Sequence, residues 1–167
     1  MSDTLNFQFA TFDDLEKIVA TYNASIPGRL ATADLVPVSV ESKVNWFNEH
    51  NETTRPLWLV YSGGKYMGWI SFSSFYGRPA YSKTVEVSIY LEESAKGKGF
   101  GKLCLQFAMN EAKKRELKTL LGFIFGHNEP SLRLFYSQGF EKWGQLPEVA
   151  DMEGVWRDLI IVGKKVD

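Results

Sequence analysis

The spacing of apolar and polar residues predicts strands and helices in the order of a mixed α/β domain. Strict alternation is typical of half-buried strands, and apolar residues three or four positions apart are typical of amphipathic helices. Strands are expected at residues 5–9, 57–61, 66–75, 84–91, 119–125, 140–145 and 155–162. Helices are expected after Thr11, after Ser39, and over residues 100–116 and 131–137. The pattern predicts a central mixed sheet with helices on both faces.

Composition indicates one globular domain over residues 1–167. The chain is 44% hydrophobic and 14% aromatic with a formal net charge of -1, which is too apolar for a disordered chain. A domain of this size needs neither a metal nor a disulfide to complete its core. No apolar run is long enough to span a membrane, and the first residues lack a signal-peptide pattern. Near-neutral charge disfavours a nucleic-acid binder. We therefore expect a cytoplasmic protein that binds neither nucleic acid nor membrane.

Three glycines lie at the junction between an expected strand and an expected helix. Residues 96–102 read Lys-Gly-Lys-Gly-Phe-Gly-Lys. Glycines leave backbone amides unshielded, and a helix N-terminus adds unpaired N–H groups and the positive end of the helix dipole. The lysines add positive charge. This segment predicts a binding site for a phosphate or pyrophosphate.

Two common phosphate-binding motifs do not fit the glycine segment. The dinucleotide motif G-x-G-x-x-G fails because Lys102 stands where the third glycine is required. The phosphate loop G-x-x-x-x-G-K-[ST] fails because Leu103 follows that lysine. A plain glycine-rich turn with solvated lysines is the structural alternative, and the helix-propensity cost of glycine disfavours it.

Two ordered motifs resemble those of the GNAT acyl-CoA N-acyltransferase superfamily. Residues 96–101 are similar to its [QR]-x-x-G-x-[GA] motif, with Lys96 at the first position, and residues 128–140 resemble N-x-x-[SA]-x-x-[LF]-Y-x-x-x-G-F. Residues 78–81 and 84–90 further resemble R-x-A-Y and T-V-E-x-S-[VI]-Y of the phosphinothricin and methionine sulfoximine acetyltransferase branch. The resemblance extends over essentially the whole chain and implies the GNAT fold.

The resemblance implies acetyl-CoA as cosubstrate, no metal, and specific residues around the cosubstrate. Its pyrophosphate would lie on the glycine segment, and its pantetheine arm would lie along the strand at 84–91 and near the second motif. The implied cofactor-binding residues are Ile89, Tyr90, Leu91, Lys96, Gly97, Lys98, Gly99, Phe100, Gly101, Lys102, Asn128 and Ser131. Helix capping is an alternative role for Asn128.

Two further residues take catalytic roles in this interpretation. Glu86 is the candidate base, directly or through water, and Tyr136 is the candidate acid that protonates the departing thiolate. A surface carboxylate and an ordinary half-buried tyrosine are the alternatives. His127 lies off the motif and is not expected to act as a base. Cys104 is expected to be a small buried residue.

One arginine and four aromatic residues are expected to form the acceptor pocket. They are Arg78, Phe75, Tyr76, Tyr81 and Trp156. Arginine can hold a carboxylate or phosphinate through two hydrogen bonds, so we expect acetyl transfer to the primary amine of a small amino-acid-like molecule. A peptide or protein N-terminus, a polyamine, and a non-enzymatic coenzyme-A-binding module remain alternatives. The aromatic content is compatible with a homodimer.

Overall fold

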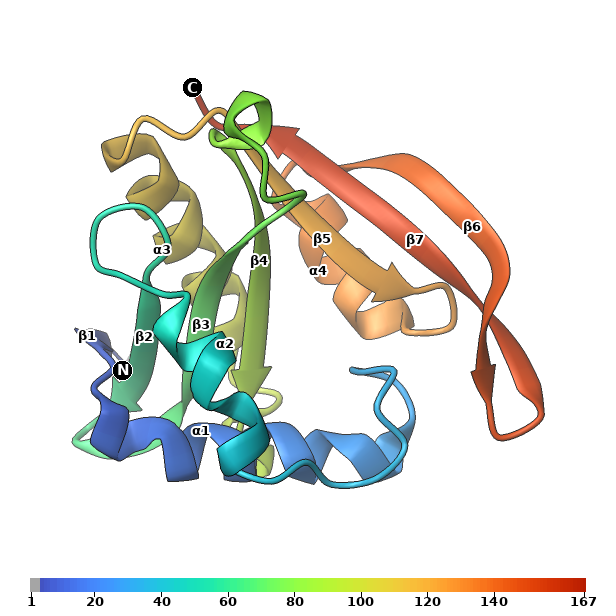
Figure 1. Ribbon diagram of the computed structural model, residues 1–167, viewed down its shortest axis with the longest axis horizontal. Helices are drawn as coiled ribbons and strands as arrows, with labels where there is room; N and C mark the ends of the chain where they lie inside the picture. The colour runs from blue at the N-terminus through green and yellow to red at the C-terminus, as the bar shows by residue number, and fades with distance from the viewer. Residues whose placement is uncertain (1–3) are drawn as a thin grey trace.

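The computed structural model describes residues 4–167 and contains a single seven-stranded sheet. The strand order is β1-β2-β3-β4-β5-β7-β6 (Figure 1). The strands are β1 Leu5–Phe9, β2 Leu57–Ser62, β3 Lys65–Ser74, β4 Thr84–Leu91, β5 Thr119–Phe125, β6 Glu141–Met152 and β7 Val155–Lys165. Neighbouring strands are antiparallel except for the parallel pair β4 and β5. The expected mixed sheet is confirmed.

Four α-helices cover the two faces of this sheet, as the sequence predicts. They are α1 Leu15–Ser25, α2 Val44–Asn48, α3 Phe100–Lys114 and α4 Glu129–Ser137. Helices α1 and α2 lie on one face, and α3 and α4 lie on the other (Figure 1). Within the described part of the chain, no helix is both long and apolar enough to cross a membrane.

The structure corrects three of the expected elements. The helix expected after Ser39 is only a 3-10 turn, Glu41–Lys43, followed by the short α2. The last two strands extend further than expected, to Met152 and Lys165. Strand β6 is an exposed edge strand with a register shift between Leu146 and Ala150. An irregular strand exposed over most of its length lacks the alternation of apolar residues by which strands are recognised.

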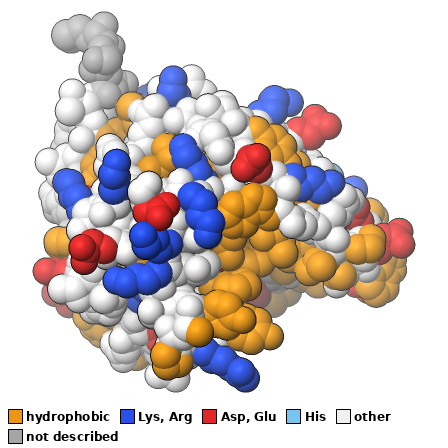
Figure 2. All heavy atoms as spheres, turned by 90° about the horizontal axis from the view of Figure 1, so that it is seen from above, with side chains coloured by type: hydrophobic (Ala, Val, Ile, Leu, Met, Phe, Trp, Pro, Cys, Tyr) orange, Lys and Arg blue, Asp and Glu red, His pale blue; other side chains and the backbone are white. Residues whose placement is uncertain are grey.

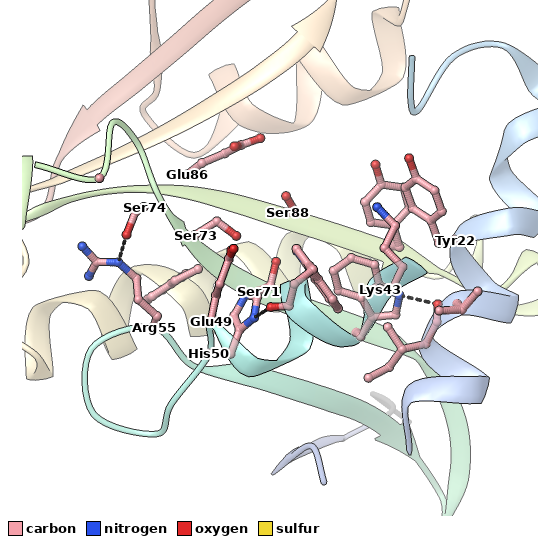
Figure 3. A pocket seen from close by; sticks show the side chains of 17 residues that line it. Tyr22, Lys43, Glu49, His50, Arg55, Ser71, Ser73, Ser74, Glu86 and Ser88 are labelled. Atoms are coloured by element: carbon pink, nitrogen blue, oxygen red, sulfur yellow. Dashed lines mark hydrogen bonds between the residues drawn. The ribbon is translucent and has the colours of Figure 1, made fainter. Parts of the chain in front are cut away.

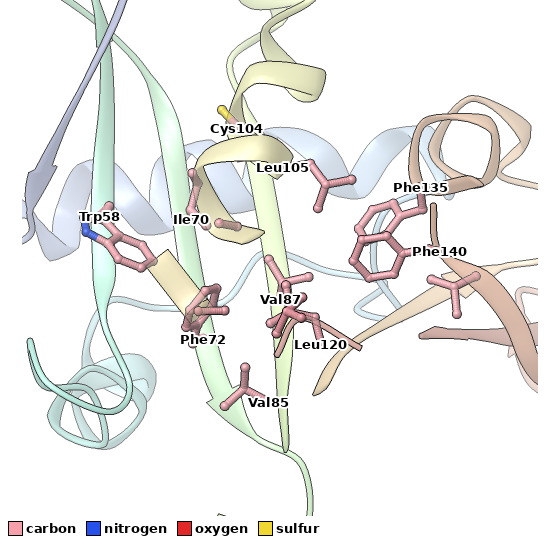
Figure 4. Close-up of a cluster of buried hydrophobic side chains, with 14 of the residues drawn as sticks. Trp58, Ile70, Phe72, Val85, Val87, Cys104, Leu105, Leu120, Phe135 and Phe140 are labelled. Carbon is pink, nitrogen blue, oxygen red and sulfur yellow. The ribbon is translucent and has the colours of Figure 1, made fainter. Parts of the chain in front are cut away.

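The main hydrophobic core lies between the sheet and the helices α3 and α4. Its members are almost fully buried, and Figure 4 shows Phe72, Leu105, Leu120 and Phe135 among them. Gly122 allows α4 to approach, because a Cβ there would lie 3.0 Å from Phe135 Cε1 and 2.9 Å from Val162 Cγ2. The sheet face that α3 and α4 cover is therefore filled by side chains.

Cys104 belongs to this core and is completely buried. Burial raises the pKa of the Cys104 thiol to about 12, so the reactive thiolate is scarce near neutral pH. The expectation of a small apolar residue at this position is confirmed.

The parallel strands β4 and β5 pair over only a short stretch. Their ladder contains Thr84 with Thr119, Val85 with Leu120, and Glu86 with Leu121. Beyond Glu86, β4 continues beside β3 to Leu91, while β5 continues beside β7. The two strands thus diverge after Glu86 and leave an opening within the sheet, with backbone groups of β4 along its edge.

Candidate active site

The glycine segment forms a turn that leads from the end of β4 into α3. Gly97 has φ +76° and Gly99 has φ +77°, and a Cβ at either position would meet no atom within 4 Å. The left-handed backbone, and not crowding, therefore requires glycine here. Gly99 is the N-cap of α3, and no side chain caps the first helical turn. The first amides of α3 are left available for an anion.

The third glycine of the segment, Gly101, is required for a different structural reason. A Cβ on Gly101 would lie 3.1 Å from Leu134 Cδ2, so this glycine permits the close approach of α3 and α4. Phe100 is 2% exposed and anchors the helix start in the core. Lys96 Nζ lies 2.9 Å from Glu93 Oε2 at the surface. The lysines therefore add charge around the turn without being fixed inside it.

A substitution at Gly99 tests the anion-binding turn. In Gly99→Ala, a residue with a Cβ must adopt a left-handed conformation, which costs about 1–2 kcal/mol. We expect the dissociation constant for acetyl-CoA, measured by calorimetry, to rise about 5- to 30-fold. Gly63→Ala is the matched control, since Gly63 has φ +56° and equally open surroundings but lies in the β2–β3 turn. Equal losses of binding in both variants would contradict the assignment.

A cavity of about 690 Å³ lies on the α1 and α2 side of the sheet. Strands β3 and β4 form one wall, and the two helices supply much of the remaining lining. Its polar lining includes Lys43, Glu49, His50, Ser71, Glu86 and Ser88 (Figure 3). The cavity is therefore amphipathic and contains side chains of both charges.

Glu86 is the last residue of β4 that pairs with β5, and its side chain lines this cavity. It faces the same side as Ser88 and Tyr90, as strand alternation predicts. Burial raises the pKa of the Glu86 carboxyl group above its ordinary value, and the described residues offer this carboxylate no ion-pair partner. A carboxylate in such surroundings is well suited to accept a proton.

Tyr136 lies at a second cavity, of about 470 Å³, on the α4 side. It is 41% exposed and lines this cavity together with His127, Leu132 and Trp156. Glu86 and Tyr136 therefore do not share a cavity. They approach from opposite faces of the sheet, and the opening between β4 and β5 is where these faces meet.

Asn128 is occupied by contacts within the protein. Its Oδ1 accepts a hydrogen bond from the Ser131 backbone N–H (3.3 Å), and its Nδ2 donates one to the Leu30 carbonyl (3.2 Å). The structure therefore contains the capping role that was the alternative for this residue. Contact of Asn128 and Ser131 with pantetheine stays a prediction.

Residues 29–31 connect the ends of the diverging strands through hydrogen bonds. The sequence indicated only that the first helix ends just before them. Three consecutive carbonyls there each accept a hydrogen bond. His127 Nε2 donates to Arg29 at 2.9 Å, Asn128 Nδ2 to Leu30, and Tyr90 Oη to Ala31 at 3.1 Å. Because Tyr90 is on β4 and the other two donors follow β5, this loop spans the open end of the sheet.

The residues expected to form one acceptor pocket are divided between two places. The rings of Phe75, Tyr76 and Tyr81 form a cluster in the β3–β4 connection, with centroids 5.5–5.8 Å apart. Arg78 is exposed in the same connection. Trp156 lies instead at the second cavity beside Tyr136. The structure thus brings four of the five residues together and places Trp156 elsewhere, because sequence order does not determine which loops meet. Their contact with an acceptor stays a prediction.

Similarity to known proteins agrees with this geometry. Residues 15–140 match the model of the acetyltransferase (GNAT) family. The chain is 46% identical over 163 residues to a Bacillus subtilis protein, YwnH, named as a candidate phosphinothricin acetyltransferase, covering 97% of this chain and 99% of that protein. It is 30% identical to the L-methionine sulfoximine/L-methionine sulfone acetyltransferase of Pseudomonas paraeruginosa, covering 92% and 90% of the two chains.

A solved structure extends the similarity to the cosubstrate. The fold superposes with a TM-score of 0.89 on a Sinorhizobium meliloti phosphinothricin acetyltransferase of the GNAT superfamily in complex with acetyl-CoA. That protein is 28% identical, and the match covers 99% of this chain and 89% of the other.

Proposed function

This chain belongs to the GNAT acetyltransferase family and is an acetyl-CoA-dependent N-acetyltransferase, and we propose that its acceptor is a small amino acid of the methionine sulfoximine or phosphinothricin type. The observation that carries this proposal is the position of Glu86. This half-buried carboxylate stands where β4 and β5 separate, inside a cavity large enough for an amino acid. The named acceptors of the similar proteins support the same class.

The residues present fit acetyl-CoA. The turn at Gly97 and Gly99 and the uncapped first turn of α3 suit its pyrophosphate. The free backbone edge of β4 beyond Glu86, with Ile89, Tyr90 and Leu91, suits the amide groups of its pantetheine arm. The cosubstrate supplies a thioester, whose carbonyl carbon can be attacked by a neutral amine.

Glu86 and Tyr136 divide the proton transfers of this reaction. Glu86 accepts a proton from the acceptor ammonium, directly or through water, so that nitrogen can attack. As the N–C bond forms and the C–S bond breaks, Tyr136 Oη delivers a proton to the departing sulfur. We expect the Leu91 N–H to donate to the carbonyl oxygen as negative charge develops there.

The cavity chemistry favours an amino acid over the alternative acceptors. A polyamine carries only positive charges and requires an acidic pocket, whereas this cavity contains Lys43 and Arg55 as well as Glu49 and Glu86. A protein N-terminus requires an extended groove, whereas this cavity has residues of α1 and of the segment around α2 among its walls. The presence of a candidate base and a candidate acid also disfavours a module that only binds coenzyme A.

The proposed acceptor class is tested with purified protein, acetyl-CoA and a panel of amines. Release of free thiol is followed with L-methionine sulfoximine, L-phosphinothricin, spermidine and a short peptide. We expect turnover with the amino-acid analogues. Turnover confined to spermidine or the peptide would contradict the proposed acceptor, and retained coenzyme binding without turnover of any amine would favour the binding module.

We further propose that two copies of the chain associate through the β6 edge of the sheet. Within the described residues, strand β6 pairs with β7 alone and exposes Trp143, Leu146 and Val149. Figure 2 shows that hydrophobic side chains also gather on the face of the molecule that is seen from above. A long edge with unpaired backbone groups is complementary to a second copy of itself.

We also propose the cytoplasm as the site of action, in keeping with a single buried cysteine and no disulfide framework.

The dimer proposal predicts a change in mass for one surface substitution. Leu146 is 42% exposed, so Leu146→Lys places a charge on the β6 edge without disturbing the core. We expect sedimentation at twice the chain mass for the wild type and at the monomer mass for the variant. Val36→Lys is the control, since Val36 is 70% exposed but lies far from β6 in the chain. A wild type that sediments as a monomer would contradict the proposal.

A further inference from the structure

Two buried polar atoms in the larger cavity have no hydrogen-bond partner among residues 4–167. They are Ser71 Oγ, in a residue that is 1% exposed, and His50 Nε2. Both residues line the cavity, Ser71 from β3 and His50 from the segment that follows α2 (Figure 3). A buried polar group without a partner is unfavourable. These two atoms are therefore candidates for polar contacts with a ligand of this cavity.

The hydrogen bonding of His50 determines which role its free nitrogen has. Nδ1 lies 2.8 Å from the carbonyl oxygen of Trp46. Because a carbonyl oxygen only accepts, Nδ1 carries the hydrogen. Burial lowers the pKa of His50, so the ring is neutral near pH 7. Nε2 is then a hydrogen-bond acceptor, and it repels an anion through its lone pair.

Ser71 lies at a suitable distance from the candidate base. In the β3–β4 ladder, Ser71 pairs with Ser88, and Ser73 pairs with Glu86. Ser71 and Glu86 are therefore diagonal neighbours on one sheet face, which lie about 7–8 Å apart. This backbone separation is of the same order as the length of an amino acid whose side chain is as long as that of glutamate. An acceptor with its amine at Glu86 can thus place its terminal group at Ser71.

The charged residues of the cavity offer no better partner for that terminal group. The Arg55 guanidinium already donates to Ser74 Oγ at 2.9 Å and to the Thr54 and Ser82 carbonyls. Lys43 Nζ lies 5.5 Å from the centroid of the Tyr22 ring. That ring contacts Tyr90, two residues and about 7 Å further along β4 than Ser88. Glu49 would repel an anion.

We propose that His50 and Ser71 form a specificity site for a neutral terminal group with both a hydrogen-bond donor and an oxygen acceptor, of which the sulfoximine group is an example. Its N–H donates to His50 Nε2, and its oxygen accepts from the Ser71 hydroxyl. A sulfone has no N–H for His50, and a phosphinate brings a negative charge against the His50 lone pair. This inference rests on the proposed function, because it requires the acceptor amine at Glu86.

The test compares three acceptors that differ in the terminal group. The wild-type kcat/KM is measured with L-methionine sulfoximine, L-methionine sulfone and L-phosphinothricin, and binding to the complex with coenzyme A is measured in parallel by calorimetry. We expect kcat/KM for the sulfoximine to exceed both others by about tenfold or more, the effect of one hydrogen bond with its unpaired partner.

Two substitutions test whether the preference for the sulfoximine depends on His50 Nε2 and Ser71 Oγ. Ser71→Ala and His50→Phe should each lower kcat/KM for the sulfoximine about 10- to 100-fold, and His50→Phe should change the sulfone rate much less. Ser71→Ala also removes an unpaired buried hydroxyl, so its melting temperature should not fall. Ser62→Ala, on β2 and outside the cavity, is the matched control.

The outcomes separate this inference from the proposed function. Equal rates with all three acceptors, or an equal loss with all three in His50→Phe, would overturn the specificity site and leave the acetyltransferase assignment intact. A phosphinothricin preference abolished by Lys43→Met would overturn it in favour of an anion site. Sulfoximine that binds through His50 and Ser71 without turnover would contradict the proposed acceptor alone, and absence of both binding and turnover would overturn both.

Discussion

Replacing Glu86 by glutamine should slow turnover by roughly 10²–10⁴ at neutral pH, the usual contribution of a general base. Glutamine retains the size of the side chain but cannot accept the ammonium proton. The measurement is kcat/KM from thiol release with saturating acetyl-CoA. Glu16→Gln, on the exposed side of α1, is the matched control and should leave the rate unchanged. An unaltered rate in Glu86→Gln at pH 7 would eliminate Glu86 as the base.

The pH dependence provides an independent check on the same residue. Because burial raises the pKa of Glu86 and the base acts when ionised, kcat/KM should rise with pH through an inflection above the ordinary carboxyl value. Glu86→Gln should lose this inflection. A wild-type rate that is constant through the acidic range would contradict the assignment.

Stability separates a catalytic role for Glu86 from a structural one. A carboxyl whose pKa is raised on folding stabilises the protein at pH values below its unfolded pKa, and this stabilisation is lost as the pH rises through the folded pKa. Above the folded pKa, the ionised Glu86 therefore does not stabilise the protein. Glu86→Gln should lose activity without a lower melting temperature at pH 7, whereas a residue with a structural role would lose both.

Replacing Tyr136 by phenylalanine should lower kcat about 100-fold or more, within the usual range for a general acid. The substitution removes only the hydroxyl, and Tyr136 is 41% exposed, so the fold should not change. Because the missing proton is needed only as sulfur departs, KM for acetyl-CoA should change little. Tyr61→Phe, on β2, is the matched control. A kcat within about twofold of the wild type would exclude Tyr136 as the acid.

Much of the fold could be predicted because it depends on local pattern. Strands β1, β4 and β5 have the expected bounds, since alternation and buried apolar runs are visible within a few residues. The turn at Gly97 and Gly99 was also evident locally, because a left-handed backbone at a helix start requires glycine itself. The course of β6 was not, because its register shift at Leu146 depends on pairing with β7.

Several features of the candidate active site could not be predicted from local sequence patterns. Strand alternation put Glu86 on the correct face, but its burial and raised pKa depend on the tertiary structure around β4. No pattern indicated that His50, which follows α2, and Ser71, on β3, would leave two unpaired atoms in one cavity. Nor did any pattern indicate that Trp156 would lie beside Tyr136 and away from Arg78.

By itself, then, the sequence determined the order of strands and helices, the glycine turn before α3 and the side of the sheet on which the candidate base lies. These features follow from the covalent chain and from interactions between residues close together along it. Only the tertiary structure decided the shape of the acceptor cavity, the bridge formed by residues 29–31 and the separation of Glu86 from Tyr136. These depend on contacts between residues distant in the chain, and such contacts are set by the packing of the whole domain.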